Sequence, residues 1–258
     1  IFGEQQKFKG QWWLMHNLLI PFGGKNDFKD INRNVCTKLL KKQNFDVFHP
    51  TFFDSYFLPY LDKKPFVLTI HDMIPELYPQ YFQQDDFQII GKQILAPKAS
   101  AIIAVSETTK KDVVRILNVP EEKVFVIHHG CSMSPLTDNQ RYFDDPYILY
   151  VGERFGYKNF SQFVTAAVTT LKRHEDLNIV CTGRPFSLAE KTLFSTLGIS
   201  DRMHHFWADT DSQLYSLYHN AECFVYPSEY EGFGIPILEA YTADCPVLLN
   251  DASCFPEI

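Results

Sequence analysis

Two carboxylates, Glu231 and Glu239, stand eight positions apart on either side of a turn-forming segment. Gly232 and Gly234 lack a Cβ, so the backbone between the carboxylates can bend sharply and lie close to a ligand. Pro236 suits the first turn of a helix, where a missing N–H leaves no hydrogen bond unmade. The free amides of a helix N-terminus attract phosphate. The segment therefore predicts a site for a ligand with an anionic middle and hydroxyl-bearing ends, such as a nucleotide-sugar.

The same residues also have an ordinary structural explanation. Ser228-x-x-Glu231 matches a capping box, and Glu239 fits a solvated helix carboxylate. A lone Glu or a lone Gly-Phe-Gly would favour that explanation. Here an apolar strand-like run at residues 222–226 leads into the segment, and ligands of open α/β sheets gather at the carboxyl ends of strands. The combination favours a ligand site.

Two cations, Arg154 and Lys158, follow another expected strand at residues 147–151. Cations in loops are usually solvated. However, a diphosphate lying over the amides of residues 232–234 needs counter-charges, because its charge grows as the sugar bond breaks. We therefore expect Arg154 and Lys158 to meet the phosphate.

A histidine and an aspartate, His71-Asp72, close the expected strand at residues 66–70. His71 could hydrogen-bond a sugar hydroxyl or a phosphate, with Asp72 fixing its tautomer. A histidine that caps a turn explains the pattern equally well. His49 is a weaker candidate, and the pair His128-His129 favours a structural role.

Other kinds of site find no support in the sequence. It shows no Ser-His-Asp or Cys-His arrangement, no Walker-type lysine loop and no G-x-G-x-x-G. The 6 cysteines form no C-x-x-C pair and no zinc-binding spacing, so we expect reduced thiols, no metal and a cytoplasmic location. No apolar run approaches the roughly 18–20 residues that cross a bilayer.

Charge is spread unevenly over a composition that is ordinary for a globular protein. Residues 1–143 carry 17 Lys+Arg against 15 Asp+Glu, a balance of +2, and residues 144–258 carry 7 against 16, a balance of −9. The split fits two domains, and the basic excess is too small to predict nucleic-acid binding. Lys38, Lys41 and Lys42 form a weak basic amphipathic patch. A solvated helix face explains that patch better than weak peripheral membrane contact.

The hydrophobic pattern indicates two α/β domains. Short apolar runs alternate with amphipathic ones, which is typical of parallel sheets with helical crossovers. A polar linker separates a domain over residues 1–135 from one over residues 136–258, and both chain ends look incomplete. The expected strands are residues 46–49, 66–71, 101–105 and 124–128 in the first domain, and 147–151, 177–181, 204–207, 223–226 and 246–249 in the second.

Together these segments resemble the family-4 glycosyltransferases over roughly residues 46–258. The family consists of retaining enzymes of the GT-B architecture, with two Rossmann-like doubly wound parallel-sheet domains that face a cleft. The matching segments are Thr69-Ile-His-Asp72, Ile103-Ala-Val-Ser-Glu107, Leu149-Tyr-Val-Gly-Glu-Arg154, Tyr157-Lys-Asn159, Leu217-Tyr218, Tyr226-Pro-Ser-Glu-Tyr-Glu-Gly-Phe-Gly-Ile-Pro-Ile-Leu-Glu-Ala240 and Ser253-Cys-Phe-Pro-Glu257.

The resemblance implies a role for each matching residue. Glu231 would contact hydroxyls of the donor sugar, and Glu239 the ribose of the nucleotide. Arg154 and Lys158 would neutralise the leaving diphosphate, and His71 would reach the donor sugar across the cleft. The rest of the implied donor-binding set is Gly232, Phe233, Gly234, Asp72, Gly183 and Arg184.

The resemblance further implies a reaction without a metal and with retention of configuration. A nucleotide-diphosphate-sugar would be the co-substrate, and a glycan or lipid-linked molecule at the inner face of the membrane the acceptor. Two features depart from the family. Its glycine-rich loop is not found, since Gly23-Gly24 is a poor substitute, and the helix expected beyond Pro256-Glu257 is missing.

Two alternative functions keep the same architecture. A nucleotide-sugar epimerase would need further acid–base groups, and none stands out. A non-catalytic nucleotide-sugar-binding module would not need Glu231, Glu239, Arg154 and Lys158 all intact. We therefore expect a hexosyltransferase-like enzyme of surface polysaccharide synthesis.

Overall fold

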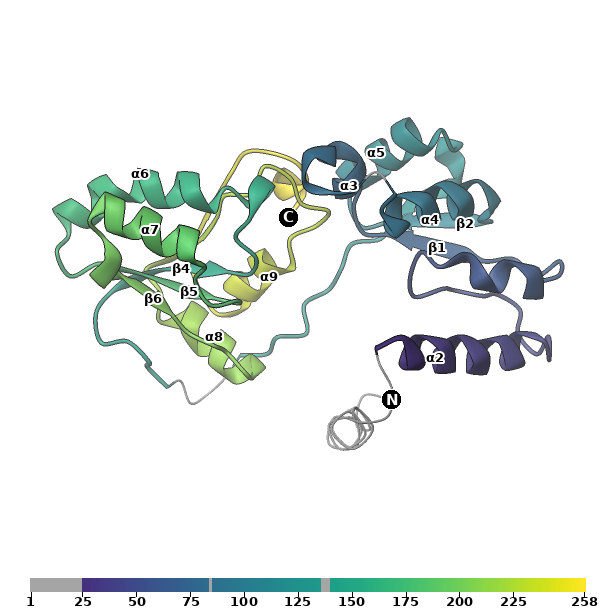
Figure 1. Ribbon diagram of the computed structural model, residues 1–258, viewed down its shortest axis with the longest axis horizontal. Helices are drawn as coiled ribbons and strands as arrows, with labels where there is room; N and C mark the ends of the chain where they lie inside the picture. The colour runs from purple at the N-terminus through teal and green to yellow at the C-terminus, as the bar shows by residue number, and fades with distance from the viewer. Residues whose placement is uncertain (1–24, 84, 136–139) are drawn as a thin grey trace. The chain divides into compact units, whose positions relative to one another are not determined.

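A computed structural model describes residues 25–83, 85–135 and 140–258 of the chain (Figure 1). The chain divides into two compact units. The first holds the residues up to Pro50 together with Asp54–Phe66, and the second holds Thr51–Phe53 and Val67–Ile258. All residues of the implied donor site belong to the second unit. Gly23-Gly24 lies outside the described residues.

The main element of the first unit is helix α2, Lys25–Leu40. It is tied to a short 3-10 helix, η2 (Ser55–Tyr60), through Asp54. The Asp54 carboxylate accepts from the N–H of Tyr56 at the start of η2 and forms an ion pair of 2.6 Å with Arg33 of α2. Asp54 thus caps one helix while holding the other.

The prediction of a strand at residues 46–49 is wrong. The structure has a single parallel bridge there, between Phe48 and Phe66. The ring of Phe48 packs against that of Phe57, with centroids 4.8 Å apart. The apolar pattern that predicted a strand therefore reflects aromatic packing without a ladder of backbone hydrogen bonds.

A three-stranded parallel sheet opens the second unit, with the strands in chain order. It consists of β1 (Val67–Ile70), β2 (Ala101–Ala104) and β3 (Val124–Val126), with α3 (Ile74–Leu77) and α4 (Phe87–Leu95) before β2 and α5 (Glu107–Leu117) before β3. Ser106 caps α5, because its hydroxyl accepts from the N–H of Thr109. Asn118 ends the helix in a left-handed conformation, with φ of 51°.

A five-stranded parallel sheet follows, in the order β6-β5-β4-β7-β8. The strands are β4 (Tyr147–Val151), β5 (Asn178–Thr182), β6 (Met203–His205), β7 (Cys223–Tyr226) and β8 (Val247–Leu249), and the helices are α6 (Phe160–Arg173), α7 (Leu188–Leu197), α8 (Asp211–His219) and α9 (Ile235–Thr242). The chain begins in the middle, runs to one edge and then crosses to the other. The strand order therefore reverses between β4 and β7, which is where doubly wound sheets bind ligands.

Two separate hydrophobic cores cover the two faces of this sheet. On one face Tyr150 and Ile179 pack with side chains of α6 and α7, such as Phe194 of α7. On the other face Leu149 packs with side chains of α8 and α9, such as Ile237 of α9. The α/β fold with two parallel Rossmann-like sheets is confirmed, with several strands ending one or two residues from their predicted limits.

Short 3-10 helices complete the described chain: η3 (Pro79–Tyr81), η4 (Ala96–Lys98), η5 (Glu121–Lys123), η6 (Gly156–Lys158), η7 (Ser200–Arg202) and η8 (Phe255–Glu257). Over the ranges that the structure describes, no helix has the length and apolar character to cross a bilayer. All six cysteines are free thiols.

Candidate active site

The segment with the two carboxylates runs from the turn after β7, which carries Glu231, into α9, which carries Glu239. Gly234 precedes the first residue of α9 with φ of 116°, a conformation that favours glycine, and a proline lies in the first turn of the helix. The capping box at Ser228 and Glu231 is not formed, because α9 begins only at Ile235. The structure thus supports the predicted turn and helix start, and rules out the capping explanation.

The backbone of this turn is fixed by Ser253 and Cys254. The Ser253 hydroxyl accepts from the N–H of Glu231 and lies 2.7 Å from its carbonyl oxygen. The Cys254 thiol donates to the carbonyl oxygen of Phe233, at 2.8 Å. These contacts leave the turn little freedom, so the Glu231 side chain projects from a rigid support.

Glu231 forms an ion pair with Lys158, which ends η6 after β4. The Nζ–Oε1 distance is 2.5 Å, and the two side chains are only 10% and 15% exposed. Lys158 also lies 5.8 Å from the centroid of the Tyr226 ring at the end of β7. Burial, followed by the charge and hydrogen bond of Glu231, raises the pKa of Tyr226, so this phenol stays neutral. A cation and a carboxylate therefore meet beside the point where the strand order reverses.

Gly232 lies against the carbonyl group of His71, which follows β1. A Cβ at position 232 would lie 1.8 Å from the His71 oxygen. On the other side, the hydroxyl of Thr109 in α5 donates to the carbonyl oxygen of Gly232 at 3.2 Å. Only glycine permits this approach, so the turn after β7 and the loop after β1 are in direct contact.

Gly232→Ala is expected to lower the free energy of unfolding by about 1–3 kcal/mol, because the new methyl group must displace backbone. Urea unfolding of the two proteins measures the difference. Gly130→Ala is the matched control, since a Cβ at Gly130 would meet nothing within 4 Å. Equal losses for the two variants would contradict the close approach.

The loop that carries His71 is anchored by a buried lysine of α4. Lys92, whose side chain is 1% exposed, donates to the carbonyl oxygen of Asp72 and forms a 2.8 Å ion pair with Glu76. The Asp72 carboxylate accepts from the N–H of Ile74, the first residue of α3. Asp72 was predicted to be the hydrogen-bond partner of the His71 ring. The structure instead has His129 in that place, with its Nε2 3.2 Å from Nδ1 of His71.

Glu239 points toward α8. Its carboxylate accepts a hydrogen bond of 3.0 Å from the Tyr218 hydroxyl. Burial raises the pKa of Glu239, although the Tyr218 hydrogen bond opposes the shift. Glu239 is therefore a half-buried acceptor one helical turn from the amides at the start of α9, and its contact with a ribose stays a prediction.

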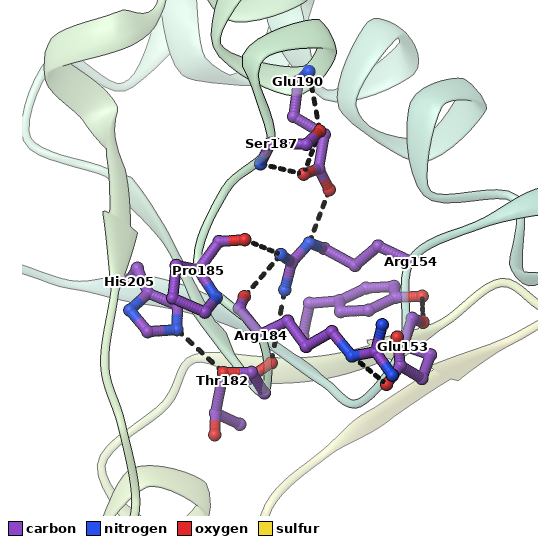
Figure 2. Close-up of polar contacts among 10 residues, drawn as sticks. Glu153, Arg154, Thr182, Arg184, Pro185, Ser187, Glu190 and His205 are labelled. Atoms are coloured by element: carbon purple, nitrogen blue, oxygen red, sulfur yellow. Dashed lines mark hydrogen bonds and ion pairs between the residues drawn. The ribbon is translucent and has the colours of Figure 1, made fainter.

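Arg154 has a different environment from the one predicted (Figure 2). Its side chain is 5% exposed, and its Nε donates to Glu190 at 2.6 Å. Its Nη1 and Nη2 donate to the carbonyl oxygens of Thr182, Arg184 and Pro185. The guanidinium group thus joins the end of β4 to the loop after β5, and a direct contact with phosphate stays a prediction.

Glu190 has two tasks in this arrangement. Besides holding Arg154, it accepts from the N–H and hydroxyl of Ser187 and so completes a capping box at the start of α7. Burial would raise the pKa of Glu190, but hydrogen bonds from Arg154 and Ser187 outweigh it and lower the pKa. No motif in the sequence indicated that Glu190 pairs with Arg154, because the two residues lie 36 positions apart.

Gly183 and Arg184 lie in the same loop. Gly183 has φ of 102°, and a Cβ there would be 2.9 Å from the carbonyl oxygen of Gly152 after β4. The Arg184 side chain is 78% exposed and pairs with Glu153 at 3.0 Å. The loops after β4 and β5 therefore touch, with one arginine buried between them and the other exposed.

The geometry brings four of the predicted residues together: Lys158, Glu231, Gly232 and His71. Arg154 and Arg184 belong to a second group around the loop after β5 (Figure 2), and Gly183 lies in the same loop. Among the residues that the structure describes, no group of three or more His, Cys, Asp or Glu side chains could hold a metal ion. The expectation of a metal-independent reaction stays a prediction.

Comparison with known proteins gives the same architecture. A glycosyltransferase from Rickettsia africae ESF-5 superposes with a TM-score of 0.64 at 20% identity, over 91% of this chain and 65% of that one. Two parallel Rossmann-like sheets of this arrangement define the chain as a GT-B protein. It belongs to the family-4 glycosyltransferases: the models "Glycosyltransferase Family 4" and "Glycosyl transferases group 1" match residues 13–134 and 137–258.

Curated relatives are similar over most of this chain. The O-antigen chain mannosyltransferase RfbU of Salmonella typhimurium is 28% identical over 247 residues, which are 96% of this chain and 62% of the relative. The GDP-mannose:cellobiosyl-diphosphopolyprenol alpha-mannosyltransferase of Xanthomonas oryzae pv. oryzae is 26% identical over 199 residues, 76% of this chain and 52% of the relative. The chain thus spans between half and two thirds of the length of these relatives, and neither is an epimerase or a binding module.

Proposed function

We propose that the chain is part of a retaining glycosyltransferase that moves a mannosyl group from GDP-mannose to a lipid-linked glycan. The two relatives named above support the mannosyl group, and the second supports the guanine nucleotide and the polyprenyl-diphosphate acceptor. Synthesis of a surface polysaccharide at the inner face of the membrane is the corresponding cellular role. Nucleic acid has no place in it, and weak peripheral membrane contact would bring the enzyme to its acceptor.

The pair of Lys158 and Glu231 is the observation that carries the proposal. The lysine places its charge beside the amides that precede α9, where the diphosphate of the donor would bind. The carboxylate next to it accepts hydrogen bonds from hydroxyls of the donor sugar. The distance of 2.5 Å between the two groups matches a ligand whose phosphate and sugar hydroxyls are adjacent.

The proposed reaction uses these charges at the moment of bond breaking. The bond between the anomeric carbon and the phosphate oxygen breaks, and the acceptor hydroxyl attacks from the same face of the sugar. The acceptor proton passes to the departing phosphate oxygen, and GDP leaves. Lys158 and the amides of residues 232–234 stabilise the growing phosphate charge, so no metal ion is required.

The remaining residues of the donor site have supporting roles in this proposal. Glu239 accepts from the ribose, His71 contacts the donor sugar, and Asp72 shapes the loop that carries His71. Around the nucleotide we place Phe233, Gly183 and Arg184. Arg154 acts on the donor through the loop after β5, since its guanidinium group is bonded to Glu190 and to three carbonyl oxygens.

Binding of the nucleotide can be tested without an acceptor. At a GDP concentration of 100 times Kd, the free energy of unfolding is expected to rise by about 2.7 kcal/mol. A thermal-shift series with GDP, GDP-mannose, UDP and ADP measures the effect, and we expect the guanine compounds to stabilise the chain most. A larger thermal shift with UDP or ADP would indicate a different donor nucleotide, and no shift with any of the four compounds would refute the proposed site.

A further inference from the structure

Two histidines from different loops of the first sheet form a bonded pair. His71 follows β1 and His129 follows β3, so both lie at the carboxyl ends of parallel strands. Nδ1 of His71 is 3.2 Å from Nε2 of His129, and the rings are within 12° of coplanar, with centroids 5.3 Å apart. That centroid separation is close to the largest that the nitrogen–nitrogen distance allows. The rings therefore meet edge to edge, which is the geometry of an N–H···N hydrogen bond.

The ring of His129 is held on a second side by Phe233, which belongs to the turn after β7. The two rings meet edge to face at 82°, with centroids 5.4 Å apart, and Phe233 is buried. Exposure differs between the two histidines: His71 is exposed and His129 is half-buried. His129 is thus fixed between His71 and the turn, while His71 is exposed to solvent.

The ring of His129 favours its neutral form. Burial, followed by the charge of His71, lowers the pKa of His129. A lowered pKa favours the neutral ring of His129, which can accept a hydrogen bond at Nε2. The other ionisable groups of these loops have partners of their own: Asp72 accepts from the N–H of Ile74, Lys92 pairs with Glu76, and His128 lies 3.8 Å from Glu257.

We propose that His129 is a positioning residue for His71, accepting a hydrogen bond at Nε2 from Nδ1–H of His71 and leaving Nε2 of His71 to face the donor sugar. The last clause rests on the proposed function, whereas the hydrogen bond does not. Neutral His71 then accepts from a sugar hydroxyl at Nε2, and protonated His71 donates there. The orientation of His71 is set by the ring on its other edge.

The tautomer of His71 tests the pair directly. In the chain labelled with 15N-histidine, two-bond and three-bond 1H–15N correlations of the rings are expected to show neutral His71 protonated at Nδ1. In His129→Phe, which keeps a ring against Phe233 but has no acceptor, His71 is expected to be protonated at Nε2. His128→Phe is the control, because His128 also contacts Phe233, with centroids 5.5 Å apart, but is not bonded to His71. The same tautomer of His71 in wild type and His129→Phe would overturn the proposal.

A sugar-transfer assay separates this proposal from the function on which its last clause rests. His129→Phe is expected to lower kcat/KM by about tenfold, the upper end for a lost neutral hydrogen bond, while the stabilisation by GDP is unchanged. His129→Gln, which retains an acceptor, is expected to recover part of the loss. If the tautomer of His71 differs between wild type and His129→Phe but the wild-type chain has no transfer activity, the positioning role is supported and the proposed function is refuted. An unchanged kcat/KM in an active enzyme would refute the positioning role.

Discussion

Lys158→Met is expected to lower kcat for sugar transfer by about 100- to 1,000-fold, the usual effect of removing one preorganised charge from a developing anion. In the structure Lys158 is the cation next to the turn that precedes α9, and 15% of its side chain is exposed. Since this charge matters most as the sugar–phosphate bond breaks, KM for the donor should change less than kcat. Steady-state kinetics with GDP-mannose measure both.

Loss of folding must be separated from loss of chemistry in this variant. Lys158→Met leaves the buried Glu231 carboxylate without its cation, at a cost of about 3 kcal/mol of unfolding free energy. The double variant Lys158→Met/Glu231→Gln removes both charges and is expected to regain most of that stability while staying inactive. Lys158→Arg keeps the charge and should retain more activity. Recovery of kcat in the double variant would show that the defect was one of folding.

Arg154→Met is expected to lower the free energy of unfolding by about 3–5 kcal/mol, the range for removing one partner of a buried ion pair. Glu190 would be left without its cation, and the carbonyl oxygens of Thr182, Arg184 and Pro185 would lose their donor (Figure 2). Chemical unfolding monitored by fluorescence measures the loss. Arg154→Lys is expected to be destabilising as well, because lysine cannot reproduce this fork of donors.

The same ion pair predicts a dependence of stability on pH. Because the pKa of Glu190 is lowered in the folded state from an ordinary value of 4.5, its contribution is fully present above that value. It is lost as the pH falls below 4.5 toward the lowered pKa. In Arg154→Met this part of the acid sensitivity should become smaller, because only Ser187 then lowers the pKa of Glu190, and in Glu190→Gln it should disappear. An unchanged acid profile in both variants would show that the pair contributes little to stability.

Local patterns were sufficient to predict much of the fold. Ser106 as the cap of α5 and the glycine and proline at the start of α9 act through neighbours within a few positions, so their effect is visible in sequence. The parallel strands are likewise short apolar runs between amphipathic helices. The run at residues 46–49 is the exception, since its side chains pack without a strand ladder.

Long-range partners could not be predicted from the same patterns. Arg154 was predicted to be a counter-charge of phosphate, yet its nearest carboxylate is Glu190, which a capping box already explains. Similarly, His71 was assigned its neighbour Asp72 as a partner, although the fold brings His129 to its ring from 58 positions away. In both cases the identity of the partner depends on how the loops that follow the strands meet in the folded chain, and the local sequence pattern does not determine that.

The central claim is that the turn at residues 231–234 and Lys158 together hold the diphosphate of a nucleotide-sugar. Calorimetric titration of GDP and GMP into the wild-type chain and into Lys158→Met tests it most directly, because the two nucleotides differ only in the distal phosphate. We expect wild type to bind GDP about 10- to 100-fold more tightly than GMP, the value of a charge-assisted contact, and Lys158→Met to lose most of that difference. An equal preference for GDP in both proteins would contradict the claim.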